Sequence, residues 1–122
     1  MRPIKLKVWD KIDKCFAPIE EIHFTTKWVA IPVNDEDGGH LEQRSFDDVE
    51  IIQFTGLLDK NGVEIYEGDI VVNNGINWEI VWKDCGWHMQ QIGKPSNGYI
   101  FLIEHPHSEV IGNIYENPEL LK

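Results

Sequence analysis

Hydrophobic and polar residues alternate with a period of two along most of this chain, which is the pattern of half-buried β-strands. Near the N-terminus Ile4, Leu6 and Val8 share one face of such a segment, with lysines between them. Polar and glycine-containing turns separate the alternating segments, so the pattern predicts about nine short strands. The expected strands are residues 4–9, 15–19, 22–31, 49–55, 63–72 with an interruption at 67–69, 78–83, 87–92, 99–103 and 110–115.

Three segments carry more specific expectations. Pro32 follows a run rich in Thr, Val and aromatic residues, and it is expected to end that strand. Residues 34–45 are polar and include a glycine pair, so we expect a long loop there that is mobile rather than functional. Residues 99–103 are apolar on both faces, which is typical of a central strand.

Turn chemistry predicts how the strands connect. Asn61-Gly62 stands between two strand-like runs and can adopt the positive φ angles of a tight hairpin turn. Gly68 can serve as a bulge or bend where a strand turns a barrel corner. Near the C-terminus Asn117 and Pro118 fit the N-cap and the first position of a single helical turn.

Together these elements predict a mostly β fold. No helical period is sustained beyond one turn, which favours a barrel or a pair of curled sheets over an α/β arrangement. The 122 residues have the length of one domain, residues 1–122. Within it we expect a small N-terminal sheet in residues 1–55 and a compact SH3-like β-barrel in residues 56–122, ending in the short helical turn.

Composition narrows the classes of partner. The formal charge is -10 and no basic cluster offsets it, so binding to phosphate backbones or anionic lipid surfaces is disfavoured. The chain has no run of about 18 apolar residues, and its N-terminal residues lack the apolar core of a secretion signal. We therefore expect a cytoplasmic protein without membrane contact, in which Cys15 and Cys85 are free thiols.

The best metal-like cluster is Glu104-His105-Pro106-His107 with Glu109, because imidazoles two positions apart on a strand can point the same way. However, Pro106 disrupts regular strand pairing, and no cysteine or third histidine has ligand spacing nearby. A solvent-facing turn explains the same residues. We expect neither a bound metal nor a cofactor.

Cys85 and His88 lie three positions apart, close to the pairing of a nucleophilic thiol with a base. On a strand these side chains point to opposite faces, and no third group with suitable spacing orients the imidazole. We interpret Cys85 as a small buried residue at a turn, and His23, His40 and His88 as surface or rim residues. No catalytic residues are expected.

Glu64, Glu67 and Asp69 form the strongest acidic group, and paired carboxylates can serve acid–base chemistry or hold Mg²⁺. The simpler explanation is structural, since Glu67-Gly68-Asp69 can bend the backbone while Asp69 caps free N–H groups of the turn. The recurring glycines lack a lysine in Walker spacing and a following helix, so they do not form a phosphate cradle. A small metal-dependent hydrolase using Glu67, Asp69 or the His105 region is an alternative function.

Tryptophans supply the other candidate surface. Trp78, Ile80 and Trp82 alternate along one expected strand and present a continuous apolar face, which is either core or contact surface. Most of the five tryptophans are expected in the core. If any stack on nucleic-acid bases, Trp82 and Trp87 beside Lys83 are the candidates, although the global charge opposes such binding.

Three ordered motifs resemble the YopX family, small proteins encoded largely by bacteriophages and prophages. This resemblance implies a mostly β fold, a phage-related origin and a bacterial cytoplasm. It implies no activity, and it offers no catalytic residues to carry over. The motifs are Arg2-Pro3-Ile4-Lys5 with Trp9-Asp10 at the start, Gln53-Phe54-Thr55-Gly56-Leu57 with Asp59-Lys60-Asn61-Gly62 and residues 65–71 in the centre, and residues 110–121 at the end.

The expected function is that of a non-enzymatic accessory protein that binds another protein, from host or phage, through barrel loops or a sheet edge. The candidate interaction surface comprises Trp82, Lys83, Trp87, Glu67 and Asp69. A nucleic-acid-linked role is the alternative, either weak direct binding or mimicry in which carboxylates imitate phosphates. Exposed strand edges and many aromatic residues also favour a homo-oligomer.

Overall fold

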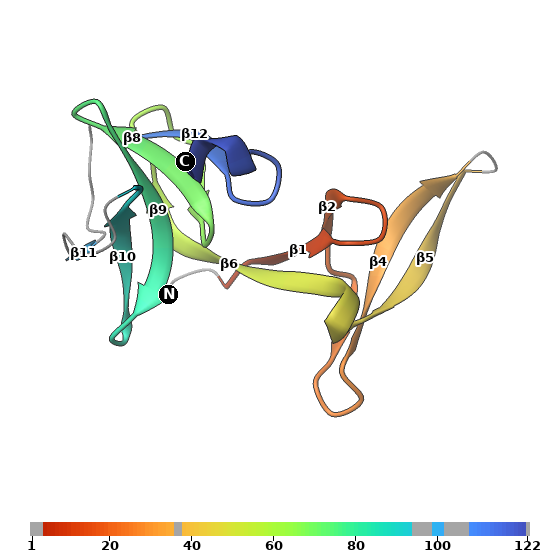
Figure 1. Ribbon diagram of the computed structural model, residues 1–122. Helices are drawn as coiled ribbons and strands as arrows, with labels where there is room; N and C mark the ends of the chain where they lie inside the picture. Colours follow the sequence, from red (N-terminus) through yellow and green to blue (C-terminus); the bar gives the residue numbers. More distant parts are fainter. Residues whose placement is uncertain (1–3, 36–37, 94–98, 102–107, 122) are drawn as a thin grey trace. The chain divides into compact units, whose positions relative to one another are not determined.

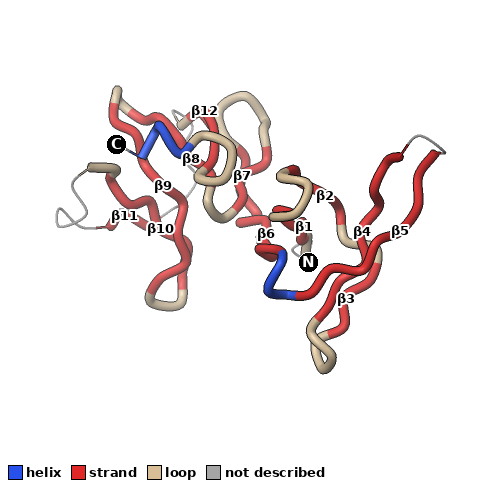
Figure 2. Tube along the Cα trace, turned by 45° about the vertical axis from the view of Figure 1, so that its right-hand side comes forward, coloured by secondary structure: helices blue, strands red, loops and turns tan. Residues whose placement is uncertain are grey.

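The computed structural model describes residues 4–35, 38–93, 99–101 and 108–121 (Figure 1). Strands make up most of the described chain, so the mostly β fold class is confirmed (Figure 2). None of the described helical segments is long or apolar enough to cross a membrane. The elements are β1 (Leu6–Asp10), β2 (Cys15–Pro18), β3 (Glu21–His23), β4 (Trp28–Asp35), β5 (Gly38–Ser45), η1 (Phe46–Asp48), β6 (Val49–Leu58), β7 (Glu64–Tyr66), β8 (Asp69–Asn73), β9 (Ile76–Lys83), β10 (Gly86–Gln91), β11 (Tyr99–Phe101), β12 (Glu109–Asn113) and η3 (Pro118–Leu121).

The chain divides into two compact units, of which the N-terminal unit comprises Lys5–Gln53. In this unit β1 pairs antiparallel with β2 on one side and with the first half of β6 on the other. Strands β3, β4 and β5 form a second antiparallel sheet. Alternate side chains of these strands face inward and form one apolar core. Its buried residues are Val8, Ala17, Val29, Ile31 and Val49.

The prediction of a loop at residues 34–45 is wrong, because most of this segment is strand β5. β5 pairs with β4 along its whole length, from Asp35 opposite Gly38 to Trp28 opposite Ser45. The hydrophobic pattern did not reveal it because most of its side chains face solvent and few need be apolar. Backbone hydrogen bonds to β4 hold the strand in place instead.

The strand predicted at 22–31 is two strands, β3 and β4, joined by a turn in which Lys27 has a φ of 60°. Pro32 lies inside β4 and does not end it. Proline is tolerated there because β3 pairs only with Trp28–Ala30. Within the described chain, the outer half of β4 therefore has a neighbouring strand, β5, on one side only.

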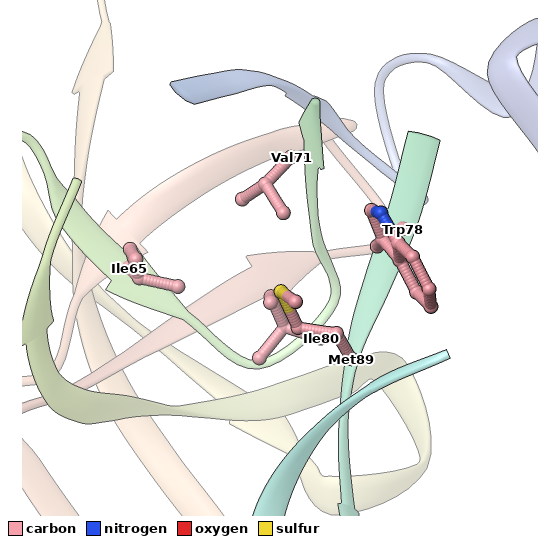
Figure 3. Close-up of a cluster of buried hydrophobic side chains, with 5 residues drawn as sticks. All are labelled: Ile65, Val71, Trp78, Ile80 and Met89. Carbon is pink, nitrogen blue, oxygen red and sulfur yellow. The ribbon is translucent and has the colours of Figure 1, made fainter. Parts of the chain in front are cut away.

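The C-terminal unit comprises the residues from Phe54 onwards, and Ile4 also belongs to it. Five antiparallel strands in the order β11-β10-β9-β8-β12 curl into a half-barrel, and β6 and β7 form a hairpin in the same unit. Figure 3 shows the buried side chains of this unit gathered from several strands. They are Ile65, Val71, Trp78, Ile80 and Met89.

The strand predicted at 99–103 is observed over Tyr99–Phe101, and residues 102–103 lie outside the described chain. Its predicted central position is wrong for the part of the chain that the structure describes, because β11 pairs there with β10 alone and ends the five-stranded sheet. An apolar run is therefore not sufficient to distinguish a central strand from an edge strand in this unit.

Two hairpins of the C-terminal unit use two-residue turns. Asn74 (φ 53°) and Gly75 (φ 76°) join β8 to β9, and Asp84 (φ 50°) and Cys85 (φ 61°) join β9 to β10. Positive φ at both central residues defines the type I′ turn, whose twist matches that of the flanking strands.

The predicted hairpin turn at Asn61-Gly62 does connect β6 to β7. Only Gly62 has a positive φ, 80°, so the expectation of positive φ at both residues is wrong. The connection is longer than a two-residue turn, with Gly62 N donating to Asp59 O at 3.1 Å and Asp59 N donating to Val63 O at 2.8 Å. A single glycine in the left-handed region is typical of a turn followed by a bulge.

The predicted C-terminal helical turn is confirmed as the 3-10 turn η3. The main-chain oxygen of Asn117 accepts from Leu120 N at 3.0 Å, as expected of a residue that starts such a turn. The side chain of Asn117 has a different role, because its Oδ1 accepts from Asn113 N at 3.2 Å. It therefore ties the final turn back to β12.

Gly112→Ala is expected to destabilise the C-terminal unit by about 2 kcal/mol, because it overpacks this junction. A Cβ at position 112 would lie 2.6 Å from Asn117 Oδ1 and 3.0 Å from Leu120 Cδ1. The midpoint of urea unfolding measures the loss. Gly39→Ala is the matched control, since the nearest atom to its added Cβ is 3.4 Å away. Equal midpoints for the two variants would contradict the prediction.

Candidate functional site

In the N-terminal unit, strands β2 and β4 line one cavity but do not pair with each other. β3 pairs with the first residues of β4, and Glu20 N still donates to Ala30 O at 2.9 Å. Before Glu20 the chain leaves β4, and β2 pairs with β1 instead. We call this the β2/β4 fork and define it by two facing segments, Cys15–Pro18 of β2 and residues 31–34 of β4 (Figure 2).

Proline chemistry explains why the fork is open. Pro18 and Pro32 occupy its two sides, one on each strand. Neither residue has a backbone N–H to donate, and proline is disfavoured within a regular ladder. A continuous sheet across the fork would lack these two donors. Strand β2 pairs with β1 instead, and this part of β4 pairs with β5.

The fork encloses a cavity of about 500 Å³, which is within the range of small ligand pockets. Its wall combines polar and apolar residues, and the polar ones are Asp10, Asp13, Cys15 and Asn34. The apolar lining residues are Phe16, Ala17, Pro18, Ile31, Pro32 and Val33. Asp10 is fully buried, whereas the side chain of Asp13 is 52% exposed, which places Asp10 at the inner end of the cavity and Asp13 at its rim.

Asp10 ends β1 and is the most buried charged residue of the N-terminal unit among those described, with 0% exposure. Its Oδ1 accepts from Ile12 N at 3.0 Å and from Arg44 Nε at 3.2 Å. Its Oδ2 is also buried and has no hydrogen-bond partner in the described chain. Because buried carboxylate oxygens are normally satisfied, this oxygen is the most unusual atom of the site.

Arg44 of β5 joins three carboxylates. Its guanidinium lies 3.2 Å from Asp10, 3.3 Å from Asp13 and 3.5 Å from Glu42, and its side chain is 10% exposed. Burial lowers the pKa of Arg44, but the hydrogen bond and charge of Asp10, with Asp13 and Glu42, outweigh this and raise it. One permanent cation therefore faces three acids, and the surroundings of the cavity carry excess negative charge.

The nearby negative charge affects the pKa of Cys15. Burial raises the pKa of its thiol first, and the charges of Asp10 and Asp13 raise it further against the opposing effect of Arg44. A thiol with a raised pKa is protonated at neutral pH and is a weak nucleophile. The charges of the site therefore favour a cation or a hydrogen-bond donor as its ligand.

The candidate residues Trp82, Lys83 and Trp87 come together on the β9–β10 hairpin of the C-terminal unit. Trp82 lies opposite Trp87 in the strand register, and their rings contact edge to face with centroids 4.9 Å apart. Trp82 is 54% exposed, whereas Trp87 packs against the core. Lys83 directly follows Trp82 and therefore points to the opposite face of the strand.

The candidate residues Glu67 and Asp69 lie at the turn between β7 and β8. Asp69 is buried, and its Oδ2 accepts from Tyr66 N at 2.8 Å, which agrees with the predicted capping role. Gly68 has a φ of 85° and connects to Ile80 and Ile114 by backbone hydrogen bonds of 2.9 Å. The structure therefore explains Asp69 and Gly68 as parts of a bend in the half-barrel.

The metal-like histidines, His105 and His107, lie outside the described residues. Within the residues that the structure describes, no group of three His, Cys, Asp or Glu side chains could hold a metal ion.

His88, predicted at the surface or rim, is buried, and its Nδ1 lies 3.0 Å from Gly86 O. Cys15 and Cys85 are both free, and Cys85 is exposed at its turn instead of buried as predicted.

Cys85→Gly is expected to stabilise the C-terminal unit by about 1 kcal/mol. Cys85 has a φ of 61°, a conformation that costs a residue with a Cβ about this much and costs glycine nothing. The melting temperature measures the gain. Cys15→Gly serves as the comparison, because Cys15 lies in strand β2 and does not have a positive φ. A lower melting temperature for Cys85→Gly would refute this account of the turn.

The sequence patterns did not identify Asp10, Asp13 and Arg44 as a site. One signal was available, because Asp10 continues the face of β1 that carries Leu6 and Val8 and so places a carboxylate on an apolar face. Arg44 gave no such signal, since it stood in a segment interpreted as a polar loop. Its hydrogen bond to Asp10 spans 34 positions and depends on the pairing of β4 with β5.

The fold and the fork define a small all-β protein of two compact units, with a buried carboxylate beneath an open strand edge. The chain belongs to the YopX family, whose model, described as YopX protein, matches residues 5–122. Among solved structures, it is similar to the crystal structure of protein EF1440 from Enterococcus faecalis. That match has a TM-score of 0.68 and 26% identity, and it covers 100% of both chains. No curated protein matches the chain.

Proposed function

We propose that this protein is a non-enzymatic protein-interaction domain whose β2/β4 fork receives an extended segment of a partner protein. The observation that carries the proposal is the pair of strand edges that line one cavity, each without a further strand in the described chain. Unpaired edge groups are a template for an added strand. Pro18 and Pro32 restrict the donors offered there, so the side chains of the segment contribute much of the contact.

Charge favours a basic segment. The protein has a formal charge of -10, and three carboxylates surround Arg44 beside the cavity. A negative surface attracts a basic partner and repels anionic ones. Family membership suggests a phage or prophage origin and a bacterial cytoplasm, so the partner is a host or phage protein.

Site-specific photocrosslinking tests the proposal. A photoreactive phenylalanine analogue at Asn34, which is exposed and lines the cavity, is expected to capture a partner in phage-carrying bacterial cells. The same analogue at Leu41 is the matched control, because Leu41 is 53% exposed on the neighbouring strand and does not line the cavity. Absence of a protein adduct at position 34, or equal adducts at both positions, would count against the fork as the interaction site.

A second candidate function rests on Trp82. An indole that is 54% exposed and held by Trp87 offers a flat surface on which a nucleic-acid base can stack. We propose weak binding of single strands at this hairpin as the alternative. Quenching of tryptophan fluorescence by oligo(dT), lost in Trp82→Ala and weakened by salt, would support it. Quenching that survives the substitution would exclude Trp82 as the stacking residue.

A further inference from the structure

We propose that the fork cavity is a pocket for a lysine side chain of the bound segment, with its ammonium group between Asp10 Oδ2 and the Asp13 carboxylate. This inference rests on the proposed function and names the residue that the fork selects. Three features carry it: the buried unpartnered oxygen of Asp10, the excess negative charge around Arg44, and the apolar residues that form part of the cavity wall.

The partner group that reaches Asp10 Oδ2 must be a hydrogen-bond donor. Asp10 Oδ2 lacks a donor in the described chain although it is buried, and an unmet acceptor of this kind costs free energy until a donor reaches it. A cationic donor gains more than a neutral one, because hydrogen bonds between charged groups are about twice as strong. An anion would face three carboxylates and only one guanidinium, which is already bonded to each of them.

The geometry of Asp10 favours an ammonium over a guanidinium. A guanidinium recognises a carboxylate best through two parallel hydrogen bonds, one to each oxygen. Asp10 Oδ1 already accepts from Ile12 N and Arg44 Nε, so only Oδ2 is open to a new donor. A compact ammonium needs only one oxygen at Asp10 and can use Asp13 at the rim for a second contact.

The cavity wall fits the lysine stem. Apolar residues from both strands form part of the cavity wall, and a lysine buries its methylene groups along such surfaces. The volume of about 500 Å³ accommodates the side chain together with part of the backbone that carries it. A metal ion is the weaker alternative, because no cluster of three suitable ligands occurs in the part of the chain that the structure describes.

The test uses the full-length protein and three acetylated, amidated pentapeptides. The first is threonine-valine-lysine-valine-threonine, and the others carry norleucine or arginine at the central position. Binding is followed by NMR from the backbone amides of Cys15, Ala17, Ile31 and Asn34, which line the fork. We expect the lysine peptide to bind about fivefold more tightly than the norleucine peptide, and more tightly than the arginine peptide.

Substitutions assign the preference to the carboxylates. Asp13→Asn is expected to reduce the preference for lysine over norleucine to about twofold, and Asp10→Asn to abolish it. Asp13 is the safer variant for folding, because its side chain is 52% exposed. Asp47→Asn is the matched control, since Asp47 is an exposed aspartate of the same unit that does not line the cavity. This control is expected to retain the full preference.

The outcomes separate the two proposals. Equal binding of the lysine and norleucine peptides, tighter binding of arginine, or a preference that Asp13→Asn leaves intact would overturn the lysine pocket. If the fork amides respond to all three peptides alike, the fork still binds a polypeptide and the proposed function stands. If no peptide shifts these amides while a partner is captured at position 34, only the lysine pocket fails. If capture also fails, the proposed function fails with it.

Discussion

Arg44→Met is expected to lower the stability of the N-terminal unit by about 3 kcal/mol, because it leaves a buried carboxylate without its cation. Asp10 is 0% exposed and the Arg44 side chain is 10% exposed, so water cannot readily replace the lost partner. Methionine keeps the length of the aliphatic stem. The loss therefore reports the charge and its hydrogen bonds more than packing.

Native-state hydrogen exchange measures this loss, because it reports the stability of each of the two units from its own amides. Amides of the N-terminal core, at the buried residues Val8 and Val29, should exchange faster by a factor corresponding to about 3 kcal/mol. Amides of the other core, at Val71 and Ile80, serve as internal controls and should change little.

The double variant Asp10→Asn with Arg44→Met distinguishes an uncompensated charge from a damaged core. Asparagine is neutral and can still accept from Ile12 N, so the double variant should recover at least half of the stability lost in Arg44→Met. A loss below about 1 kcal/mol in the single variant would show that the pair is unimportant for folding. Further destabilisation in the double variant would show that Asp10 stabilises the unit independently of Arg44.

Strands with one buried face were predictable from the sequence. In β9 the buried residues Trp78 and Ile80 alternate with less buried neighbours, and in β1 Val8 is buried between partly exposed ones. Burial of one face imposes the period of two directly on the sequence. The C-terminal 3-10 turn was also predictable, because Pro118 is favourable at the first position of such a turn.

Strand β5 and the carboxylate site were not predictable by the same reasoning. The side chains of β5 are mostly exposed, so its sequence carries no apolar alternation and its position depends on hydrogen bonds to β4. Asp10 and Arg44 meet only after β5 has paired with β4. Local spacing also misplaced Cys85 and His88, because a type I′ turn leaves Cys85 exposed at the end of its hairpin whereas His88 is buried.

The Asn-Gly dipeptide forms two different turns in this protein. It forms a two-residue turn at Asn74-Gly75 but part of a longer turn at Asn61-Gly62. The difference lies in Asp59, whose carboxylate accepts three backbone hydrogen bonds and so organises the longer turn. An aspartate that hydrogen-bonds N–H groups two and four positions ahead competes with the tight hairpin turn.

Asp59→Ala is expected to destabilise the C-terminal unit by about 3 kcal/mol, because it removes several hydrogen bonds to a charged acceptor. Oδ1 accepts from Asn61 N at 2.8 Å and from Val63 N at 2.9 Å, and Oδ2 accepts from Val110 N at 2.9 Å. The last bond joins the turn to β12, 51 positions away. Asp59→Asn should cost about half as much, because its amide can still accept at one oxygen position but places a donor towards Val110 N.

The pH dependence of this effect has a definite sign. Burial alone would raise the pKa of Asp59, but the hydrogen bonds from Val110, Val63 and Asn61, together with Lys60, outweigh it and lower the pKa below its ordinary value of 3.8. A group whose pKa is lower in the folded state contributes stability that is fully present above its unfolded pKa. The stability difference between wild type and Asp59→Ala should therefore be constant from pH 5 to 7, and should shrink as the pH falls through the lowered folded-state pKa.

Urea unfolding at several pH values measures this stability difference, and Asp47→Ala, at an exposed aspartate of the other unit, is the control. A difference that grows on acidification would mean that the carboxylate of Asp59 does not stabilise the turn in its charged form.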